Sequence, residues 1–500
     1  MKQGNFENEE FIRVGTTLYK LVNQPRLNGG YVKKRIVWNN ETLRQDYGKD
    51  YLATVPKYDG FCTVPDHVDY RPVVDKFLNL YEPIPLVGRV CFFAQEEKKG
   101  TTMPAKFELI APCFFGCEST AKFELNRIGA ENIRVDDGRL TFSGGAEMIA
   151  AANLHLRTVE RVLLLLARYK ASTFDELFDG VYSVPWEDLL PTDAAFPVTG
   201  SSLDSQLSSV PACQSIIKKA VVKRLMAKHH TSVLPESGTE YKIRFMLRKN
   251  VCEIMLDTTG EGLHKRGYRR NAMEAPIRET LAATIADLGR VRRDSLVEDP
   301  FCGSGTLLIE AAQKAMNIAP GLKRRFAAER YSFVPAAVWA EQRQKALAES
   351  KLDVGFEAFG YDIDPAAVAL ANANAKLAGV EKRCHFEVAD VADFAAKQEA
   401  IVLTNPPYGE RMSTIEGATK LARTLGRQME ANPCAGVYAI TADMDFETHY
   451  GKRANKRRKM YNGMIPCQLY MYYNAPKFEH TAKPMPKSGF DGKRRFDKKD

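Results

Sequence analysis

The residues that could do chemistry most directly lie at 404–411, where Thr-Asn-Pro-Pro-Tyr-Gly-Glu-Arg follows a short apolar run. The apolar run predicts a buried strand, so this turn would begin at a strand end. The side-chain oxygen of Asn405 and the carbonyl of Pro406 could both accept hydrogen bonds from the exocyclic amine of a nucleobase, which would localise the lone pair on its nitrogen. Pro406 and Pro407 would fix the backbone in advance, and Tyr408 would offer a flat face for a base that has left its helix. The alternative is an ordinary proline-rich turn after a core strand.

A second motif lies earlier, where a predicted strand ends in Asp-Pro-Phe-Cys-Gly-Ser-Gly-Thr and a predicted helix follows. Strand, glycine turn and helix form the nucleotide-binding corner of a doubly wound sheet. The missing Gly-Lys-Ser/Thr ending argues against a phosphate-cradling loop, and the missing third glycine disfavours NAD. We expect Gly303 and Gly305 to let the backbone approach a ligand, and Asp299 to meet the positive end of a methionine-type cofactor. Pro300 and Cys302 complete this turn, Cys302 as a small packing residue rather than a nucleophile.

Carboxylates follow the next two predicted strands. Asp364 and Pro365 are typical of a helix N-cap and first turn, which leaves Asp362 free at the strand tip to accept both hydroxyls of a ribose. Asp390 follows the next strand, where it could accept from the adenine amine of the same cofactor. For Asp390 a plain turn aspartate is an equally good interpretation.

The order of these motifs resembles that of class I S-adenosylmethionine-dependent amino-methyltransferases. Residues from about 105 to 475 also resemble one branch, the bacterial THUMP-domain guanine-N2 RNA methyltransferases that modify 23S rRNA. The stretches that carry the resemblance, in chain order, are Ala111 to Glu124, Arg157 to Leu166, Lys265 to Arg269, Ala275 to Glu279, Asp299 to Thr306, Asp362 to Pro365, Asn405 to Arg411, and Lys456 to Gly463.

This resemblance implies an α/β fold in which a Rossmann-like doubly wound sheet with an antiparallel edge hairpin follows ferredoxin-like and THUMP α+β modules. The implied domains are a ferredoxin-like module at 105–170, a THUMP RNA-binding domain at 171–268 and a methyltransferase domain at 275–475. An extension of unknown role at 1–100 precedes them, and a basic tail of disordered composition at 477–500 follows. The implied cofactor is S-adenosylmethionine, held by Asp299, Pro300, Cys302, Gly303, Gly305, Asp362 and Asp390. Some relatives carry a second methyltransferase domain, which we do not expect in a chain of this length.

Basic residues are unevenly placed and favour a polyanionic partner. The net charge is +9, and positions 452–459 hold six basic residues in eight. A predicted helix at 215–228 is also basic. The candidate RNA contacts are Lys218, Lys219, Lys223, Arg224, Lys456, Arg457 and Arg458. The resemblance adds Arg411, which would bind a phosphate or hold the loop itself. The alternative for each charge run is a solvated face.

Local patterns also predict elements outside the catalytic motifs. Strands are expected at 31–38, 107–112, 139–143, 196–200, 241–247 and 251–257, helices at 118–128 and from 146, and a hairpin of 457–460 with 465–473 around Asn462-Gly463.

Composition describes an ordinary water-soluble chain of two to four domains, with 45% hydrophobic and 27% charged residues. No apolar run approaches the roughly 20 residues that span a bilayer, and the first residues show no signal-peptide pattern. The ten cysteines lack zinc-ligand spacing. We therefore expect a cytoplasmic protein with reduced thiols, no metal and no membrane partner; the oligomeric state stays open.

The resulting hypothesis is methyl transfer to the N2 amine of a guanine in structured RNA, with 23S rRNA favoured over tRNA. The turn at Asn405 would serve any exocyclic amine, so adenine-N6 or cytosine-N4 methylation, of RNA or DNA, is a second hypothesis. A non-catalytic RNA-binding assembly factor is a third.

Overall fold

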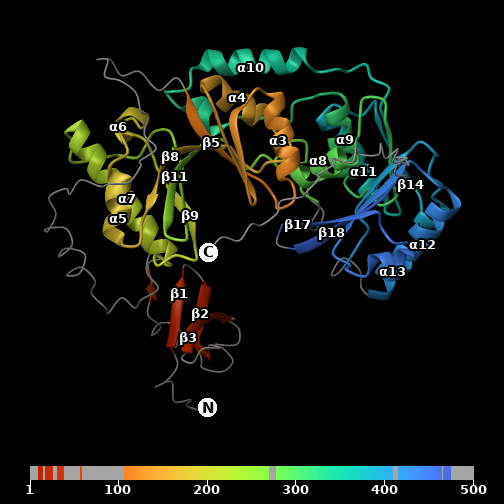
Figure 1. Ribbon diagram of the computed structural model, residues 1–500, viewed down its shortest axis with the longest axis horizontal. Coiled ribbons are helices and arrows are strands. Elements are labelled where there is room, and N and C mark those ends of the chain that lie inside the picture. Colours follow the sequence, from red (N-terminus) through yellow and green to blue (C-terminus); the bar gives the residue numbers. More distant parts are fainter. Residues whose placement is uncertain are drawn as a thin grey trace, which may run out of the picture.

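The computed structural model describes residues 106–269, 277–408, 415–463 and 465–473, together with the backbone of four strands between residues 10 and 58. Two seven-stranded sheets dominate it, one in the centre and left of Figure 1 and one at its right. Tail residues 477–500, Arg411, Ala275 and Pro276 lie outside the described residues.

The methyltransferase sheet has the order β14-β13-β12-β15-β16-β18-β17. Its strands are β12 (Leu296–Asp299), β13 (Glu357–Asp362), β14 (Cys384–Val388), β15 (Ile401–Thr404), β16 (Gly436–Thr441), β17 (Lys456–Asn462) and β18 (Ile465–Tyr473). The first five strands run parallel, and β18 pairs antiparallel with β16 and β17. The strand order reverses beside β12, because both β13 and β15 pair with it. Ligands of open α/β sheets bind at such a reversal, outside the carboxyl ends of the strands.

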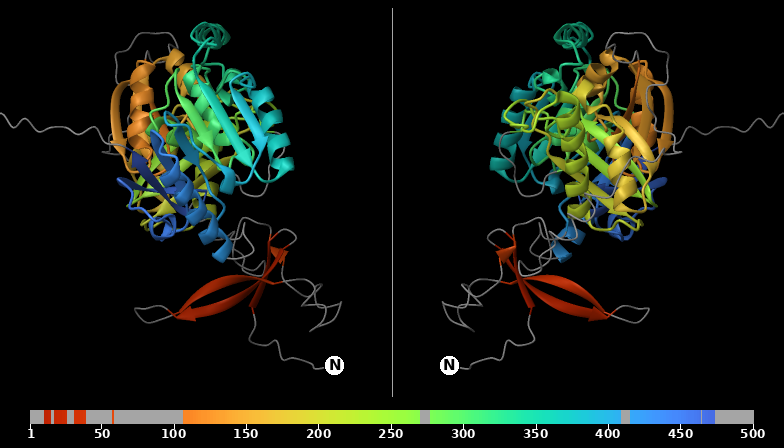
Figure 2. Two further views of the ribbon diagram at one scale, coloured as in Figure 1. Left: turned by 90° about the vertical axis from the view of Figure 1, so that its right-hand side faces the viewer. Right: turned by 90° about the vertical axis from the view of Figure 1, so that its left-hand side faces the viewer.

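Helices cover both faces of this sheet. On one face lie α8 (Glu279–Leu288), α9 (Thr306–Ala315) and α11 (Pro365–Ala378), and on the other lie α12 (Ile415–Ala431), α13 (Phe446–Tyr450) and the short helix η3 (Val391–Asp393). Two further elements, η2 (Ala327–Arg330) and α10 (Ala336–Ala348), follow α9. Helix α10 crosses the top of the molecule and packs on α4, as the side views also show (Figures 1 and 2).

The second large sheet joins the ferredoxin-like and THUMP modules without a break, in the order β6-β7-β5-β8-β11-β10-β9. Its strands are β5 (Phe107–Pro112), β6 (Glu131–Asp136), β7 (Arg139–Gly144), β8 (Leu163–Lys170), β9 (Val198–Leu203), β10 (Ile243–Arg248) and β11 (Val251–Asp257). The helices are α3 (Glu118–Arg127), α4 (Ala146–His155), α5 (Phe174–Tyr182), α6 (Trp186–Leu189) and α7 (Val210–His229). Strand β8 pairs with β5 on one side and β11 on the other, so the two modules share it.

Buried polar contacts join this sheet to the methyltransferase part. Arg266 and Glu310 form an ion pair at 3.4 Å with side chains 1% and 0% exposed, and the Tyr268 hydroxyl donates to the same carboxylate at 3.0 Å. The rings of Tyr241 and Tyr331 stack at 4.4 Å across the junction. A buried charge without a partner is costly, so this junction favours one fixed arrangement of the modules.

The first hundred residues contain a four-stranded sheet in the order β3-β2-β1-β4. Its strands are β1 (Glu10–Val14), β2 (Thr17–Pro25), β3 (Tyr31–Trp38) and β4 (Lys57–Tyr58). The predicted strand at 31–38 matches β3, and those at 107–112 and 251–257 match β5 and β11. The strand predicted at 196–200 is displaced, because β9 begins at Val198 and ends at Leu203. Helix α7 begins five residues before the predicted 215, with Ser209 as its N-cap.

No helix within the described ranges combines the length and apolar character needed to cross a bilayer.

Candidate active site

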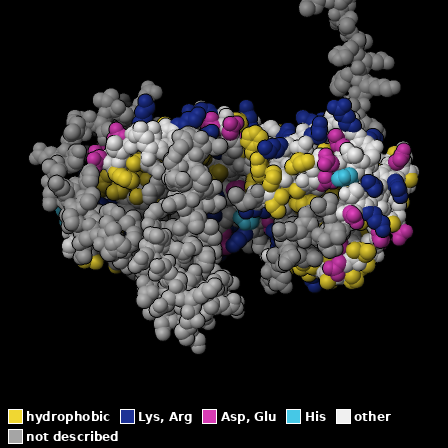
Figure 3. All heavy atoms as spheres, turned by 90° about the horizontal axis from the view of Figure 1, so that it is seen from below, with side chains coloured by type: hydrophobic (Ala, Val, Ile, Leu, Met, Phe, Trp, Pro, Cys, Tyr) yellow, Lys and Arg dark blue, Asp and Glu magenta, His cyan; other side chains and the backbone are white. Residues whose placement is uncertain are grey.

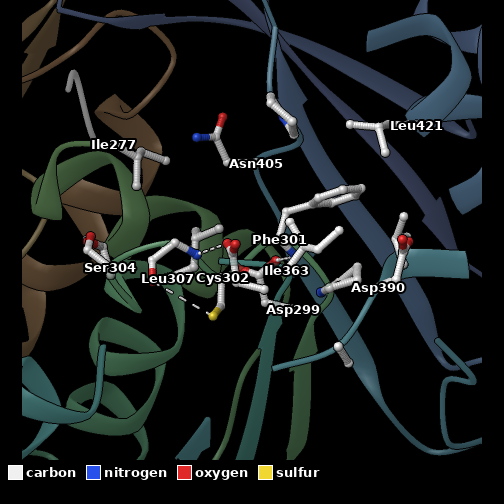
Figure 4. A pocket seen from close by; sticks show the side chains of 17 residues that line it. Ile277, Asp299, Phe301, Cys302, Ser304, Leu307, Ile363, Asp390, Asn405 and Leu421 are labelled. Atoms are coloured by element: carbon white, nitrogen blue, oxygen red, sulfur yellow. Dashed lines mark hydrogen bonds between the residues drawn. The ribbon is translucent and has the colours of Figure 1, made fainter. Parts of the chain in front are cut away.

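A cavity of about 520 Å³ lies at the carboxyl ends of β12, β13 and β15. In the view of Figure 4, Asn405 and Leu421 lie on one side and Asp299, Cys302 and Ile363 on the other, with Ser304 and Asp390 at the two ends. The lining residues are Ile277, Asp299, Pro300, Phe301, Cys302, Gly303, Ser304, Thr306, Leu307, Asp362, Ile363, Ala389, Asp390, Val391, Asn405, Pro407 and Leu421. The volume lies within the range of about 300–1,000 Å³ typical of small-molecule sites.

Asp299 ends β12 at the floor of this cavity. Its side chain is buried, and its Oδ1 accepts from the Thr404 hydroxyl at 2.7 Å and from the Phe301 amide at 3.0 Å. Burial raises the pKa of the Asp299 carboxyl from 3.8 to about 7, against the lowering effect of these two hydrogen bonds; nearby Asp362 raises it further. A carboxylate that is costly to ionise in the free protein would gain from a cation placed beside it.

Asp362 holds the glycine turn in place. Its Oδ2 accepts from the Gly303 amide at 2.9 Å and its Oδ1 from the Asp364 amide at 3.0 Å. Asp362 is therefore not free as expected, because its carboxylate binds the backbone of two turns, and its contact with a ribose stays a prediction. It still lines the cavity. Asp364 caps α11 as expected, accepting from the Ala366 amide at 2.9 Å.

The two glycines of the turn serve different purposes. Gly303 has φ +51 and nothing within 4 Å of the position where a Cβ would lie, so its backbone is open to the cavity. Gly305 has φ +77 and does not line the cavity; a Cβ there would lie 2.9 Å from the Phe386 ring. Gly305 thus lets the turn pack closely against the Phe386 ring, and its contact with a ligand stays a prediction. Pro300 and Cys302 both line the cavity.

Burial raises the pKa of the Cys302 thiol far above its ordinary value, which suits a packing residue. Asp390 lies at the far end of the cavity and is exposed. Its Oδ1 accepts from the Ala392 amide at 2.9 Å and so caps η3. The capping role is thus present, and contact with a cofactor stays a prediction.

Asn405 carries an unpartnered polar atom at the site. Its side-chain oxygen is buried and has no hydrogen-bond partner among the described residues. A buried acceptor left without a donor is costly and calls for an explanation. Asn405 lines the cavity and in Figure 4 projects into its open space. The arrangement suits an acceptor that waits for an incoming N–H group.

The neighbouring Tyr408 does not match its predicted role. Its side chain is only 6% exposed and does not line the cavity. The hydroxyl lies 3.7 Å from Cys467 Sγ and accepts from Asn462 Nδ2 at 3.4 Å. The stacking face expected at Tyr408 is therefore covered in this structure, because the ring packs against the β17–β18 hairpin. Pro407 lines the cavity, whereas Pro406 is buried beneath it, and the role of the Pro406 carbonyl stays a prediction.

Several cavity residues were not named from the sequence. Phe301, Ile363, Val391 and Leu421 add apolar surface, and Ser304 adds a hydroxyl. Ile363 is 69% exposed although it is apolar. Phe301 and Ile363 each follow a predicted site residue in the chain, so motif position alone could have suggested them.

The candidate RNA contacts on α7 are partly engaged within the protein. Arg224 forms a bidentate pair with Glu187 at 2.8 and 2.5 Å, and Lys218 pairs with Glu236 at 2.5 Å. Lys223 lies over the Phe178 ring. Arg224 is therefore a structural residue of the THUMP module rather than a free contact. Lys219 stays a candidate.

The second basic group begins in the loop before β17 and continues along that strand, within the predicted hairpin. Lys456 and Arg457 are exposed on β17, with Arg457 3.7 Å from Glu447. Arg458 is half-buried and donates to the Gly116 carbonyl at 2.6 Å. The predicted RNA contact at Arg458 was therefore wrong as regards its side chain in this structure, which ties the hairpin to the ferredoxin-like module.

The fold and site together define a class I methyltransferase. Three family models match consecutive parts of the chain: the RlmL ferredoxin-like domain at 108–163, the THUMP domain at 171–257, and the RMKL-like methyltransferase domain at 266–471. Strand β8 falls between the first two matches, consistent with its shared position.

Curated relatives extend the match. The chain is 39% identical over 372 residues to the "Putative RNA methyltransferase YpsC" of Bacillus subtilis, covering 74% of this chain and 96% of that protein. It is 31% identical over 365 residues to the ribosomal RNA large subunit methyltransferase K/L of Shewanella baltica, covering 71% of this chain but 52% of that protein. The chain thus spans about half the length of the K/L enzymes. It belongs to the THUMP-domain methyltransferase family that includes these proteins.

Solved structures agree. A "predicted N6-adenine-specific DNA methylase" from Listeria monocytogenes matches with a TM-score of 0.70 and 40% identity, over 74% of this chain and 97% of that one. SMU.472, "a putative methyltransferase complexed with SAH", matches with a TM-score of 0.71 and 38% identity, over 75% of this chain and all of that one. The cofactor of this family is S-adenosylmethionine, and the protein is a methyltransferase that uses it.

Proposed function

We propose that the protein methylates the exocyclic N2 amine of a guanine in structured RNA, with 23S rRNA as the favoured target. The observation that carries the proposal is the unpartnered, buried oxygen of Asn405 in the wall of the cavity that holds the glycine turn. An aromatic amine offers the N–H donor that this oxygen lacks.

The cavity fits S-adenosylmethionine on three observations. Gly303 leaves open space above its backbone, the Asp299 carboxyl lies buried where a cation would favour its ionised form, and apolar side chains at Phe301 and Ile363 offer surfaces for a flat ring. Asp299, Gly303, Asp362 and Asp390 would hold the cofactor. When bound, it supplies a methyl group on a positively charged sulfur, so the protein needs chiefly to position the reacting groups.

The residues of this chain would then orient the acceptor. Asn405 Oδ1 accepts from the amine and fixes the direction of its lone pair. The Thr404 hydroxyl, bound to Asp299, holds the start of this turn against the cofactor end of β12. The amine loses a proton after methylation, and water can take it, because an alkylated aromatic amine with a positive charge is strongly acidic.

RNA as the substrate is supported by the domain composition. The THUMP match covers 171–257, and the Tyr331 ring ties that module to the catalytic part, because it stacks on Tyr241 and its hydroxyl donates to the Asp257 carbonyl at 2.7 Å. A guanine inside a helix would have to leave its stack to reach the cavity. The names of the YpsC and K/L relatives refer to RNA and to ribosomal RNA, which favours the same substrate class.

The proposal is tested by incubating the purified protein and S-adenosylmethionine with rRNA and tRNA lacking N2-methylguanosine, then digesting the RNA and identifying methylated nucleosides by mass spectrometry. We expect N2-methylguanosine from 23S rRNA. N6-methyladenosine would instead establish the adenine hypothesis, modified tRNA alone would move the target to tRNA, and no methylation with intact RNA binding would favour the assembly factor.

Asn405→Ala supplies the matched variant. Removing one preorganised acceptor is expected to lower kcat by about 10²–10³, while the affinities for cofactor and RNA stay within a few-fold. Full activity in this variant would refute the role given to the turn.

A further inference from the structure

A second cavity, of about 710 Å³, lies on the opposite side of α12 from the catalytic one. Its walls come from the carboxyl-terminal half of α12, the start of β16, the end of β18 and the loop after α13. Leu421 of α12 lines the catalytic cavity, whereas Arg423 and Arg427 of the same helix line this one. The two cavities are therefore separate sites that share a wall. We call the second one the basic cavity.

Four cations line the basic cavity: Arg423, Arg427, Lys452 and Arg453. All four are exposed, and within the described part of the chain none forms an ion pair. Glu430 is the one acidic side chain in the lining, which leaves a net charge of +3 from these five residues. His449, also in the lining, already pairs with Asp443 at 2.6 Å. Two arginines four residues apart on one helix face repel each other, so an anion between them would relieve a cost that the free protein bears.

A buried hydroxyl supplies an independent observation. Tyr472 lines the same cavity and is 4% exposed, and its hydroxyl makes no hydrogen bond with any described residue. An unpartnered buried hydroxyl is unfavourable, and it can donate to a phosphate oxygen. Both the uncompensated charge and the unpartnered donor therefore point to an anionic, oxygen-rich ligand.

The surroundings favour a long anion over a small one. The loop at 451–455 leads directly into β17, where Lys456 and Arg457 are exposed. In Figure 3, which views the molecule from below, Lys and Arg side chains spread over the methyltransferase end of this face, with acidic and hydrophobic side chains between them. The exposed cations thus continue from the basic cavity onto β17.

We propose that the basic cavity binds the sugar–phosphate backbone of the RNA substrate, at a site separate from the THUMP module. The inference rests on the proposed function, since it takes RNA as the substrate. Backbone contacts position a nucleic acid without reading its sequence. An RNA held here and by the THUMP module would meet the catalytic domain from two directions, which would fix the target nucleotide over the cavity that contains Asn405.

The test compares two quadruple variants of the full chain. The cavity variant carries Arg423→Ala, Arg427→Ala, Lys452→Ala and Arg453→Ala. The control carries Arg292→Ala, Arg293→Ala, Lys351→Ala and Lys382→Ala, which removes the same charge from exposed residues that form no ion pair within the described ranges. Binding of an rRNA fragment is measured across a salt series, alongside melting temperature and cofactor affinity.

The cavity variant is expected to bind RNA at least tenfold more weakly, with a salt slope reduced by about 0.7–0.9 for each lost phosphate contact. The control should keep the wild-type affinity within twofold, and both variants should keep the wild-type melting temperature and cofactor affinity. Equal RNA affinity of the two variants would overturn the inference while the proposed function stands. A wild-type protein that binds no RNA would overturn both.

A photo-cross-linking residue at Thr448, an exposed position in the lining, gives a second readout that does not depend on a multiple substitution. We expect RNA to be cross-linked from this position during turnover and not from position 382. Cross-links only within the protein chain would contradict the assignment.

Discussion

Asp299→Asn should stabilise the free protein at alkaline pH. The Asp299 side chain is 1% exposed, and burial raises the pKa of its carboxyl from 3.8 to about 7. Asparagine keeps an oxygen that can accept from Thr404 and Phe301, the two donors found here. The substitution therefore removes the charge while keeping the shape and both hydrogen bonds.

The size of the expected gain in unfolding free energy follows from the linkage between protonation and folding. An acid whose pKa is higher in the folded state binds protons more tightly there, so its contribution to stability is largest below pH 3.8 and is lost as the pH rises towards 7. Each pKa unit corresponds to about 1.4 kcal/mol. The shift from 3.8 to about 7 thus corresponds to a cost of up to about 4 kcal/mol above pH 7, which the substitution should remove.

The assay is urea unfolding of both proteins between pH 4 and pH 8.5 without cofactor. The two unfolding free energies should agree near pH 4 and diverge up to about pH 7, with the variant the more stable. Asp390→Asn is the control, because it makes the same substitution at an exposed residue of the same cavity. A stability difference that does not change with pH would refute the reasoning. If Asp299 faces a cationic cofactor, the same variant should also bind it about tenfold more weakly, as calorimetry would measure.

Four further substitutions test individual contacts. Gly305→Ala should lower the unfolding free energy by about 2 kcal/mol, because φ is +77 and the new Cβ would meet the Phe386 ring; an unchanged urea midpoint would contradict this. Arg458→Ala should lower stability by about 1–2 kcal/mol and leave RNA affinity intact, whereas Lys456→Ala should do the reverse, as paired unfolding and binding measurements would show. Asn462→Ala should reduce kcat several-fold without changing cofactor affinity, because the Tyr408 hydroxyl loses its donor; unchanged kcat in single-turnover kinetics would argue against this link.

The catalytic strands could be predicted from the sequence, because their local residue pattern agrees with their position in the sheet. Each combines an apolar core with a motif at its carboxyl end, as in β12 before the glycine turn and β15 before Asn405. Such strands are buried on both faces, which gives short continuous apolar runs. The sequence could not predict that two modules share β8. The apolar run of this strand at 163–167 would fit a core strand in any sheet. Strand pairing is a long-range property.

For the site too, the sequence predicted some features and not others. The residue types at Asp299, Gly303 and Asn405 indicated a cofactor corner and an amine acceptor, and all three line one cavity. The internal hydrogen bonds of Asp362 and Tyr408 could not be deduced, because they form with a backbone amide and with the β17–β18 hairpin, which lie far away in the sequence. A motif predicts which polar atoms lie at a strand end. Which of these atoms face the ligand depends on contacts with other parts of the chain.

The arrangement also explains why the acceptor turn and the cofactor acid occur together. Strands β12 and β15 are adjacent and parallel, so their carboxyl ends meet at one edge of the sheet. The last residue of β15, Thr404, donates to the last residue of β12, Asp299, and Asn405 is the next residue in the chain. One hydrogen bond and one peptide link therefore separate Asp299, the proposed cofactor acid, from Asn405, the proposed amine acceptor. Because each is fixed to the other through regular strands rather than through a loop, their relative position is set before either ligand arrives, and preorganisation of this kind lowers the reorganisation required in the transition state.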